Sequence, residues 1–148
     1  MFKQILITLD GSPRAESVLQ PALDVARAMR SGVTLLRIVD ATGKESERGS
    51  VRAGSSDAAM RSLAARQAQN YLERIARESL GDDLVVQIVV KEGVPAKQIL
   101  DAAEEARADL IAMATRARTG LKKLMLGSVA EAVMHETSLP LLLVRCAS

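Results

Sequence analysis

The sequence predicts a single α/β domain built on an open, parallel, five-stranded sheet with helices on both faces. Short apolar stretches alternate with one-sided helical patterns in the order βαβαβαβαβ. Right-handed crossovers and helices on two faces require the strand order to reverse once, which places the first strand centrally and predicts the order 3-2-1-4-5. A length of 148 residues suits one domain covering 1–148.

The predicted strands are apolar throughout, as expected for strands that are covered on both faces. Glycine, proline or polar turn residues bound each of them. They are expected at Lys3–Leu9, Val33–Val39, Leu84–Val90, Leu110–Met113 and Leu139–Val144.

The first helix is predicted from the turn cluster that follows the first strand. Ser12 is a suitable N-cap, with Pro13 at the first helical position. Pro21 falls inside the helical pattern and predicts a kink. Gly32 is expected to end the helix.

Residues 41–56 interrupt the alternation of strands and helices. They contain one large apolar residue, Val51, among glycine, serine and charged residues, which predicts a mobile loop. Ser56 or Asp57 then caps a second helix, which Gly81 ends. Helical spacing predicts that its inward side consists of Met60, Leu63, Ala64, Gln67, Tyr71, Ile75 and Leu80.

Two shorter helices complete the pattern. Gly93-Val94-Pro95 introduces a third helix whose stripe includes Ile99 and Ala103, and Gly127-Ser128 opens a fourth. His135, the single histidine, falls in the last turn of the fourth helix, where a cation interacts favourably with the helix dipole.

Composition limits the classes of partner. The chain carries 20 basic and 18 acidic residues, so its charge does not favour nucleic acid or an anionic membrane. Its aromatic residues are Phe2 and Tyr71, too few for base stacking.

No apolar run is long enough to span a bilayer and the start does not resemble a signal peptide, so a cytoplasmic location is expected. Cys146 is a lone cysteine and forms no internal disulfide.

A ligand site is predicted where the first and fourth strands end, because ligands of open α/β sheets bind at the reversal point of the strand order. Asp10-Gly11-Ser12 would lie there beside the 114–128 segment. That segment carries Arg116, Arg118, Lys122 and Lys123 and leads into a helix N-terminus, which favours an anion. The alternative is a solvated basic loop.

The chain resembles the universal stress protein family over essentially its whole length, apart from residues 41–56. The stretches that carry the resemblance are Ile5–Ser12, the segment from Gly93-Val94-Pro95 to Ile111, and Leu110–Val144. The resemblance implies a Rossmann-like, nucleotide-binding fold and a regulatory role in stress responses. ATP-binding members carry the pattern G-x2-G-x9-G-[ST]. Here Ala114 and Ala117 replace the first two glycines, Gly127-Ser128 matches the last pair, and the spacing is kept.

The resemblance also implies a set of nucleotide contacts, with ATP or another adenine nucleotide as ligand, together with Mg. Thr8, Leu9 and Asp10 match adenosine contacts, and Ile38 matches a position in the adenine pocket. The glycine-loop segment contributes Met113, Ala114, Arg116, Ala117, Gly127, Ser128 and Val129.

Structural alternatives stay open for several of these residues. Leu9 and Ile38 are also ordinary core residues, Asp10 can cap the first helix, and Ser128 is an N-cap with or without phosphate. The two alanine methyl groups weaken close approach of a ligand, while Arg116 and Arg118 can compensate through phosphate contacts.

No catalytic residue and no metal site is predicted, since no Cys/His cluster, P-loop or nucleophile elbow is present. The expected protein is not an enzyme, or at most a slow ATPase.

Members of the family pair the last strand antiparallel with its copy, which implies a homodimer through Leu139–Val144. The alternative function is a dimeric interaction module that binds no nucleotide and acts through unknown protein partners.

Overall fold

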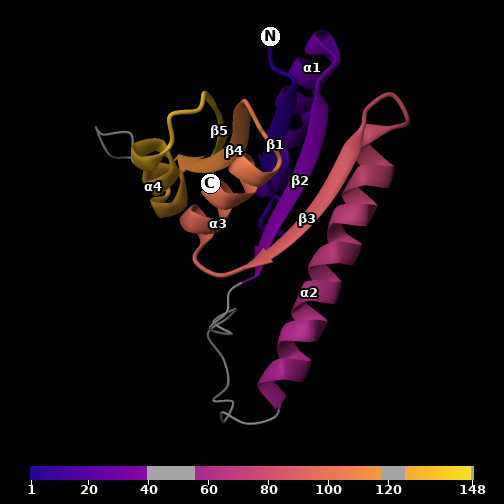
Figure 1. The fold of residues 1–148 in the computed structure, drawn as a ribbon, viewed down its shortest axis with the longest axis vertical. Coiled ribbons are helices and arrows are strands. Elements are labelled where there is room, and N and C mark those ends of the chain that lie inside the picture. Colours follow the sequence, from indigo (N-terminus) through magenta and orange to yellow (C-terminus); the bar gives the residue numbers. More distant parts are fainter. Residues whose placement is uncertain (40–55, 118–125, 148) are drawn as a thin grey trace.

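The computed structural model describes residues 1–39, 56–117 and 126–147, and it contains a five-stranded parallel sheet (Figure 1). The strand order is β3-β2-β1-β4-β5, and every neighbouring pair is parallel, which confirms the predicted fold class. The strands are β1 Gln4–Thr8, β2 Gly32–Val39, β3 Val86–Glu92, β4 Leu110–Ala117 and β5 Leu141–Ala147.

Helices cover both faces of the sheet, as the two apolar clusters show. Ile7 and Leu35 belong to the cluster beneath α1 and α2, while Leu6 and Leu36 belong to the cluster beneath α3 and α4. Successive side chains of a strand point to opposite faces, so each buried strand contributes to both clusters. The helices are η1 Ala15–Val18 (a 3-10 turn), α1 Leu19–Met29, α2 Ser56–Ile75, η2 Ala76–Leu80 (a π-helical turn), α3 Pro95–Glu105 and α4 Ser128–Glu136.

The first helical segment begins differently from the prediction. Arg14, rather than Ser12, is the N-cap of η1, although the Ser12 hydroxyl oxygen accepts a hydrogen bond from the Ala15 N–H at 3.2 Å. The chain changes from 3-10 to α-helix at Leu19, so Pro21 lies in the first turn of α1. Proline is tolerated there because first-turn N–H groups have no helical partner.

The end of α1 also differs from the prediction. Arg30, not Gly32, adopts the left-handed conformation that closes the helix, with φ of 56°. Ser31 N–H then donates to the Ala26 carbonyl at 2.8 Å, which satisfies the helix end. Gly32 already belongs to β2 and pairs with Gln4.

The N-terminal half of α2 is not packed as predicted. Met60 and Leu63 are 56% and 51% exposed, and Gln67 is exposed as well. The buried residues of this helix, Ala68, Leu72 and Ile75, lie in its second half. A 20-residue helix is about 30 Å long, whereas the seven residues of β3 span about 23 Å. Figure 1 shows the first turns of α2 extending past the end of β3.

The predicted loop at 41–56 lies, apart from Ser56, outside the described residues. Gly81 ends the second helical segment as predicted, with a positive φ of 67°.

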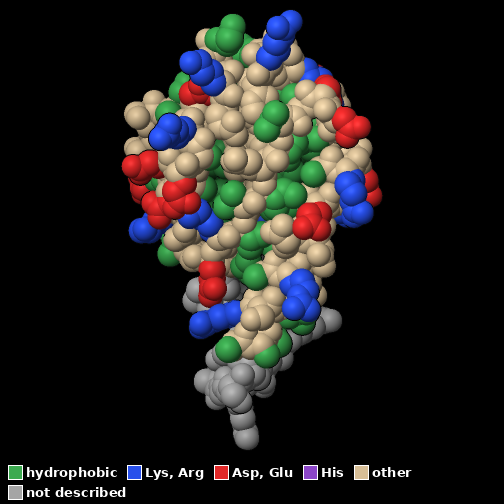
Figure 2. Space-filling view, turned by 45° about the vertical axis from the view of Figure 1, so that its right-hand side comes forward, with side chains coloured by type: hydrophobic (Ala, Val, Ile, Leu, Met, Phe, Trp, Pro, Cys, Tyr) green, Lys and Arg blue, Asp and Glu red, His purple; other side chains and the backbone are tan. Residues whose placement is uncertain are grey.

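Figure 2 shows apolar side chains gathered on one face of the molecule, with charged side chains around them.

The register of the sheet brings the carboxyl ends of β1 and β4 together. Ile7 pairs with Ala112, and β1 ends one residue later at Thr8. β4 continues to Ala117, so its last residues lie beside the chain that leaves β1. The strand order therefore opens a crevice between these two strand ends, as expected for a reversal point.

Candidate functional site

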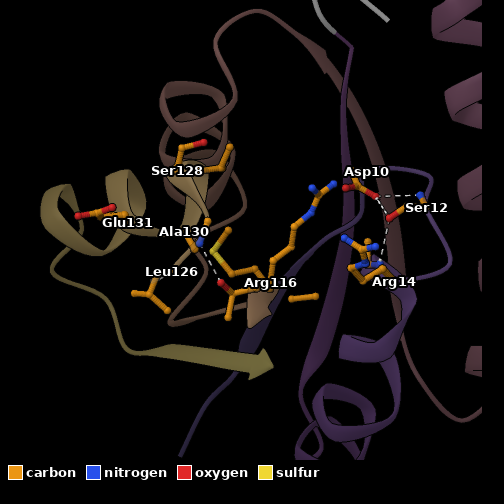
Figure 3. A pocket seen from close by; sticks show the side chains of 14 residues that line it. Asp10, Ser12, Arg14, Arg116, Leu126, Ser128, Ala130 and Glu131 are labelled. Carbon is orange, nitrogen blue, oxygen red and sulfur yellow. Dashed lines mark hydrogen bonds between the residues drawn. The ribbon is translucent and has the colours of Figure 1, made fainter. Parts of the chain in front are cut away.

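A pocket of about 540 Å³ lies between the chain after β1, the end of β4 and the start of α4 (Figure 3). These three segments are adjacent because β1 and β4 are neighbours in the sheet. The pocket is lined by Asp10, Ser12, Arg14, Ala15, Met113, Ala114, Thr115, Arg116, Leu126, Gly127, Ser128, Val129, Ala130 and Glu131.

The Asp10 loop forms one wall, and its carboxylate is held by the loop itself. Asp10 Oδ1 accepts hydrogen bonds from the Ser12 N–H at 2.8 Å and the Ser12 hydroxyl at 2.5 Å. Such turns are typical of aspartate before a tight bend. Gly11 has φ of +87°, a backbone conformation that residues with a Cβ rarely adopt, so this position favours glycine. The arrangement presents Asp10 at the pocket.

The β4 wall contains Ala114, which the family pattern would make a glycine. Ala114 is half-buried, belongs to β4 and pairs with Val144. Among the described residues other than glycine, positive φ is found at Arg30 and Arg107. The methyl group of Ala114 therefore causes no backbone strain, and close approach of a ligand remains the reason a glycine would matter here. Ala117 is the last residue of β4, and its side chain lies outside the described part of the structure.

The start of α4 forms the third wall. Gly127 is the N-cap, so the expectation that Ser128 is the N-cap is wrong, and Ser128 is instead the first helical residue. The Gly127 N–H donates to Thr115 Oγ1 at 3.1 Å, which ties the helix start to β4. The N–H groups of the first helical turn have no partner within a helix, so they favour an anion at this end of the pocket.

Two arginines enter the pocket from different segments. Arg14 comes from the loop before η1, and Arg116 from β4, and Figure 3 shows the Arg116 side chain extending toward Asp10. Within residues 1–39, 56–117 and 126–147, neither guanidinium forms a hydrogen bond or ion pair. Arg118, Lys122 and Lys123 fall outside those ranges.

Sequence reasoning missed Arg14 and Thr115 as site residues. Arg14 is close in sequence to Asp10, and that proximity was the available signal. Thr115 lies in an apolar strand and is 4% exposed, so a polar side chain at a buried strand position was the signal there.

Three predicted contacts do not line this pocket. Leu9 is 3% exposed within the α1/α2 cluster, and its N–H donates to the Leu36 carbonyl at 2.9 Å. Ile38 is half-buried against the α3/α4 cluster, on β2. Thr8, the last residue of β1, pairs with Leu36. The other predicted residues with described side chains, Asp10, Met113, Ala114, Arg116, Gly127, Ser128 and Val129, are brought together.

The described residues contain no group of three or more His, Cys, Asp or Glu side chains arranged to hold a metal ion. Among the same residues, no helix is both long enough and apolar enough to cross a membrane.

Comparison with known proteins identifies the family of this chain. The family model of the universal stress protein family matches residues 1–145. Universal stress protein MJ0531 of Methanocaldococcus jannaschii is 30% identical over 145 residues, covering 98% of this chain and 83% of the relative. Universal stress protein YxiE of Bacillus subtilis is 27% identical over 155 residues, covering 98% of this chain and all of the relative (100%).

Solved structures agree with these sequence matches. The structure of MJ0577 aligns with a TM-score of 0.74 at 28% identity, over 98% of this chain and 96% of that one. A universal stress protein solved in complex with cAMP shares the fold, with a TM-score of 0.63 at 16% identity over 98% of each chain. The chain therefore belongs to the universal stress protein family.

Proposed function

We propose that this protein is a cytoplasmic regulatory protein of stress responses that binds an adenine nucleotide in the pocket between the Asp10 loop and the start of α4. The observation that carries the proposal is the meeting of the Asp10 carboxylate, two arginines and the N-terminus of α4 around one cavity of about 540 Å³. That volume suits a small organic ligand.

The two ends of the pocket match the two ends of a nucleotide. At one end, Oδ1 of Asp10 accepts the hydrogen bonds of Ser12, while Oδ2 has no hydrogen-bond donor among the described residues and can accept a hydrogen bond from a ribose hydroxyl. At the other end, the first turn of α4 offers N–H groups and the positive end of the helix dipole to phosphate.

Related structures support the ligand class. One universal stress protein was solved in complex with cAMP, and one from Archaeoglobus fulgidus was solved in complex with dAMP. Both share the fold of this chain. We extend the adenine nucleotide class to this chain on the strength of the pocket.

The proposed role is binding rather than catalysis. Hydrolysis of ATP needs a group that positions or deprotonates water. Asp10 and Glu131 are the carboxylates that line the pocket. Oδ1 of Asp10 already accepts two hydrogen bonds from Ser12, and Glu131 lies on α4, on the opposite side of the pocket (Figure 3). Any ATPase activity would therefore be slow.

We further propose a homodimer formed through β5. This strand is at the edge of the sheet and reads Leu-Leu-Leu-Val before Arg145. An apolar edge strand has unpaired N–H and C=O groups that favour pairing with another strand. Antiparallel pairing with a second copy would satisfy both strands symmetrically.

One observation favours the alternative, a dimeric interaction module that binds no nucleotide. The Ala114 methyl group lies at the pocket wall where the family pattern has glycine. If this methyl group fills the space of the ligand, the pocket would serve packing alone.

The first experiment is mass spectrometry of small molecules released from freshly purified, denatured protein, followed by calorimetric titration with ATP, ADP and AMP. Near-stoichiometric adenine nucleotide, or binding in the micromolar range, is expected. An empty protein that gives no heat at millimolar nucleotide would contradict the proposal and favour the interaction module.

A further inference from the structure

Arg14 and Arg116 are brought together by contacts that neither the family pattern nor the sequence spacing specifies. Arg116 pairs in register with Cys146 across β4 and β5. The Cys146 thiol in turn contacts the Arg14 carbonyl oxygen, with 3.4 Å between Sγ and O. Neighbouring strands lie about 4.8 Å apart, so the end of β5 holds the backbones of both arginines close to each other.

Both side chains then enter the same pocket, on the side of Asp10 (Figure 3). The described residues offer neither guanidinium a hydrogen-bonding or ionic partner. Asp10 is the nearby anion, and its Oδ1 accepts the Ser12 hydrogen bonds. Glu131, in the first turn of α4, also lines the pocket, and Figure 3 shows it on the opposite side of the pocket from Asp10. On the side of Asp10, two arginines face one carboxylate, which leaves an excess of positive charge there, and the start of α4 adds its dipole.

The geometry points to a two-arginine clamp for the phosphate chain of a nucleoside di- or triphosphate, with no requirement for a divalent cation. Guanidinium groups bind phosphate oxygens through paired, charge-assisted hydrogen bonds. A bound Mg²⁺ would supply two positive charges to such a chain, and Arg14 and Arg116 supply the same number. Arg14 binds the phosphate chain from the Asp10 loop and Arg116 binds it from β4, so the phosphate chain lies between the two guanidinium groups.

This inference rests on the proposed nucleotide function for its adenine moiety, whereas the clamp is tested without it. Sodium tripolyphosphate is titrated calorimetrically in buffer with EDTA against the wild type and the variants Arg14→Gln and Arg116→Gln. Glutamine keeps most of the side-chain length and removes the charge. The matched control is Arg145→Gln, because Arg145 is exposed, lies on β5 in register with Thr115 of β4 and does not line the pocket.

The expected result is tripolyphosphate binding in EDTA that each clamp variant weakens about tenfold or more, while the control changes it less than about twofold. Arg14→Lys and Arg116→Lys should recover part of the affinity, since lysine restores charge without the planar fork. Titration with ATP and AMP should show that the clamp variants lose ATP affinity and keep AMP affinity. Equal unfolding temperatures would show that the variants are folded.

The outcomes separate the clamp from the nucleotide function. Tripolyphosphate binding that depends on both arginines, without binding of any nucleotide, would support the clamp and contradict the proposed function. Nucleotide binding that is unchanged in both clamp variants would keep the proposed function and overturn the clamp. Loss of ATP binding in EDTA, with recovery in Mg²⁺, would also overturn it, as would the absence of tripolyphosphate binding.

Discussion

The backbone N–H of Gly127 donates a hydrogen bond to the side-chain oxygen of Thr115, with 3.1 Å between the two atoms. Thr115 is 4% exposed and belongs to β4, whereas Gly127 is the N-cap of α4. The bond therefore fixes the helix start against the strand that forms the opposite side of the pocket. The first helical residues, Ser128, Val129 and Ala130, line the pocket, so the bond anchors the start of α4 beside the cavity.

Removal of the Thr115 hydroxyl should loosen this anchor. Thr115→Val keeps the shape of the side chain and leaves the Gly127 N–H without its acceptor, at an expected cost of about 1–2 kcal/mol in the free energy of unfolding. Urea denaturation measures this cost. Thr115→Ser, which keeps the hydroxyl, is the control and should lose less. Equal loss in both variants would mean that the methyl group, not the bond, matters.

Restoration of the family glycine at position 114 should move stability and affinity in opposite directions. Ala114 is in an extended strand, so Ala114→Gly relieves no strain and should lower the free energy of unfolding by about 0.5–1 kcal/mol. The lost methyl group should at the same time allow closer approach of ATP and tighten its binding. Calorimetry and urea denaturation test the two effects. Unchanged or weaker ATP affinity would show that the methyl group does not obstruct the site.

Tyr71 should ionise only at unusually high pH. Burial raises the pKa of its hydroxyl well above the ordinary 10.0, and the hydrogen bond to Glu16, at 2.9 Å, raises it further. Ionisation would remove the proton that the Tyr71 hydroxyl donates to Glu16 and would place the phenolate beside the Glu16 carboxylate. Because Tyr71 is the single tyrosine, absorbance at 295 nm follows it alone.

The sign of the effect of Tyr71 on stability follows from this pKa. A folded-state pKa above the unfolded value of 10.0 contributes stability that is complete below pH 10 and is lost as pH rises beyond it. Glu16→Gln should lower the absorbance midpoint, because the carboxylate charge is removed. Equal absorbance midpoints for Tyr71 in the native and the urea-unfolded protein would contradict this interpretation.

Asp109 should contribute stability that is lost in acid. Its carboxylate accepts the N–H groups of Lys3, at 2.8 and 3.0 Å, and Gln4, at 3.0 Å, and joins the start of β4 to that of β1. Burial raises its pKa, but these backbone hydrogen bonds outweigh burial and hold the pKa below 3.8. The stabilisation is therefore present above pH 3.8 and lost as pH falls through the lower folded-state value.

Asp109→Asn is the variant that isolates this carboxylate. The difference in unfolding free energy between wild type and variant should be largest at neutral pH and should shrink below pH 3.8. Urea denaturation at a series of pH values measures it. A difference that stays constant down to pH 2 would show that the charge is not involved.

The proposed dimer should depend on the free edge of β5. The Pro140 carbonyl accepts the Ile111 N–H, so Pro140 faces β4, and alternation along the strand turns the Leu143 N–H to the free edge. Leu143→Pro removes this donor and should produce monomers in analytical ultracentrifugation. Leu143→Ala is the control, because it loses the same side-chain packing and keeps the N–H. A dimer that persists in the proline variant would contradict edge pairing.

Much of the fold and part of the site were predictable because they depend on local patterns and general topology. The apolar runs specified the strands, and the right-handed crossover rule specified that β1 lies beside β4. That adjacency brings Asp10 to the segment containing Ala114 and Arg116, as predicted. The inward face of α2 was predicted only in part, since periodicity identifies a face but not how much sheet lies beneath it. Met60 and Leu63 are therefore exposed.

The sequence by itself determined the fold class, the strand order and the sheet end at which the site lies, because these follow from residue periodicity and chain chirality. The tertiary structure decided which side chains complete the site. The Thr115–Gly127 bond, the approach of Arg14 to Arg116 and the left-handed cap at Arg30 depend on strand register and on how α1 and α4 pack. These contacts join residues whose relative position no local pattern specifies, so they become visible only in the folded chain.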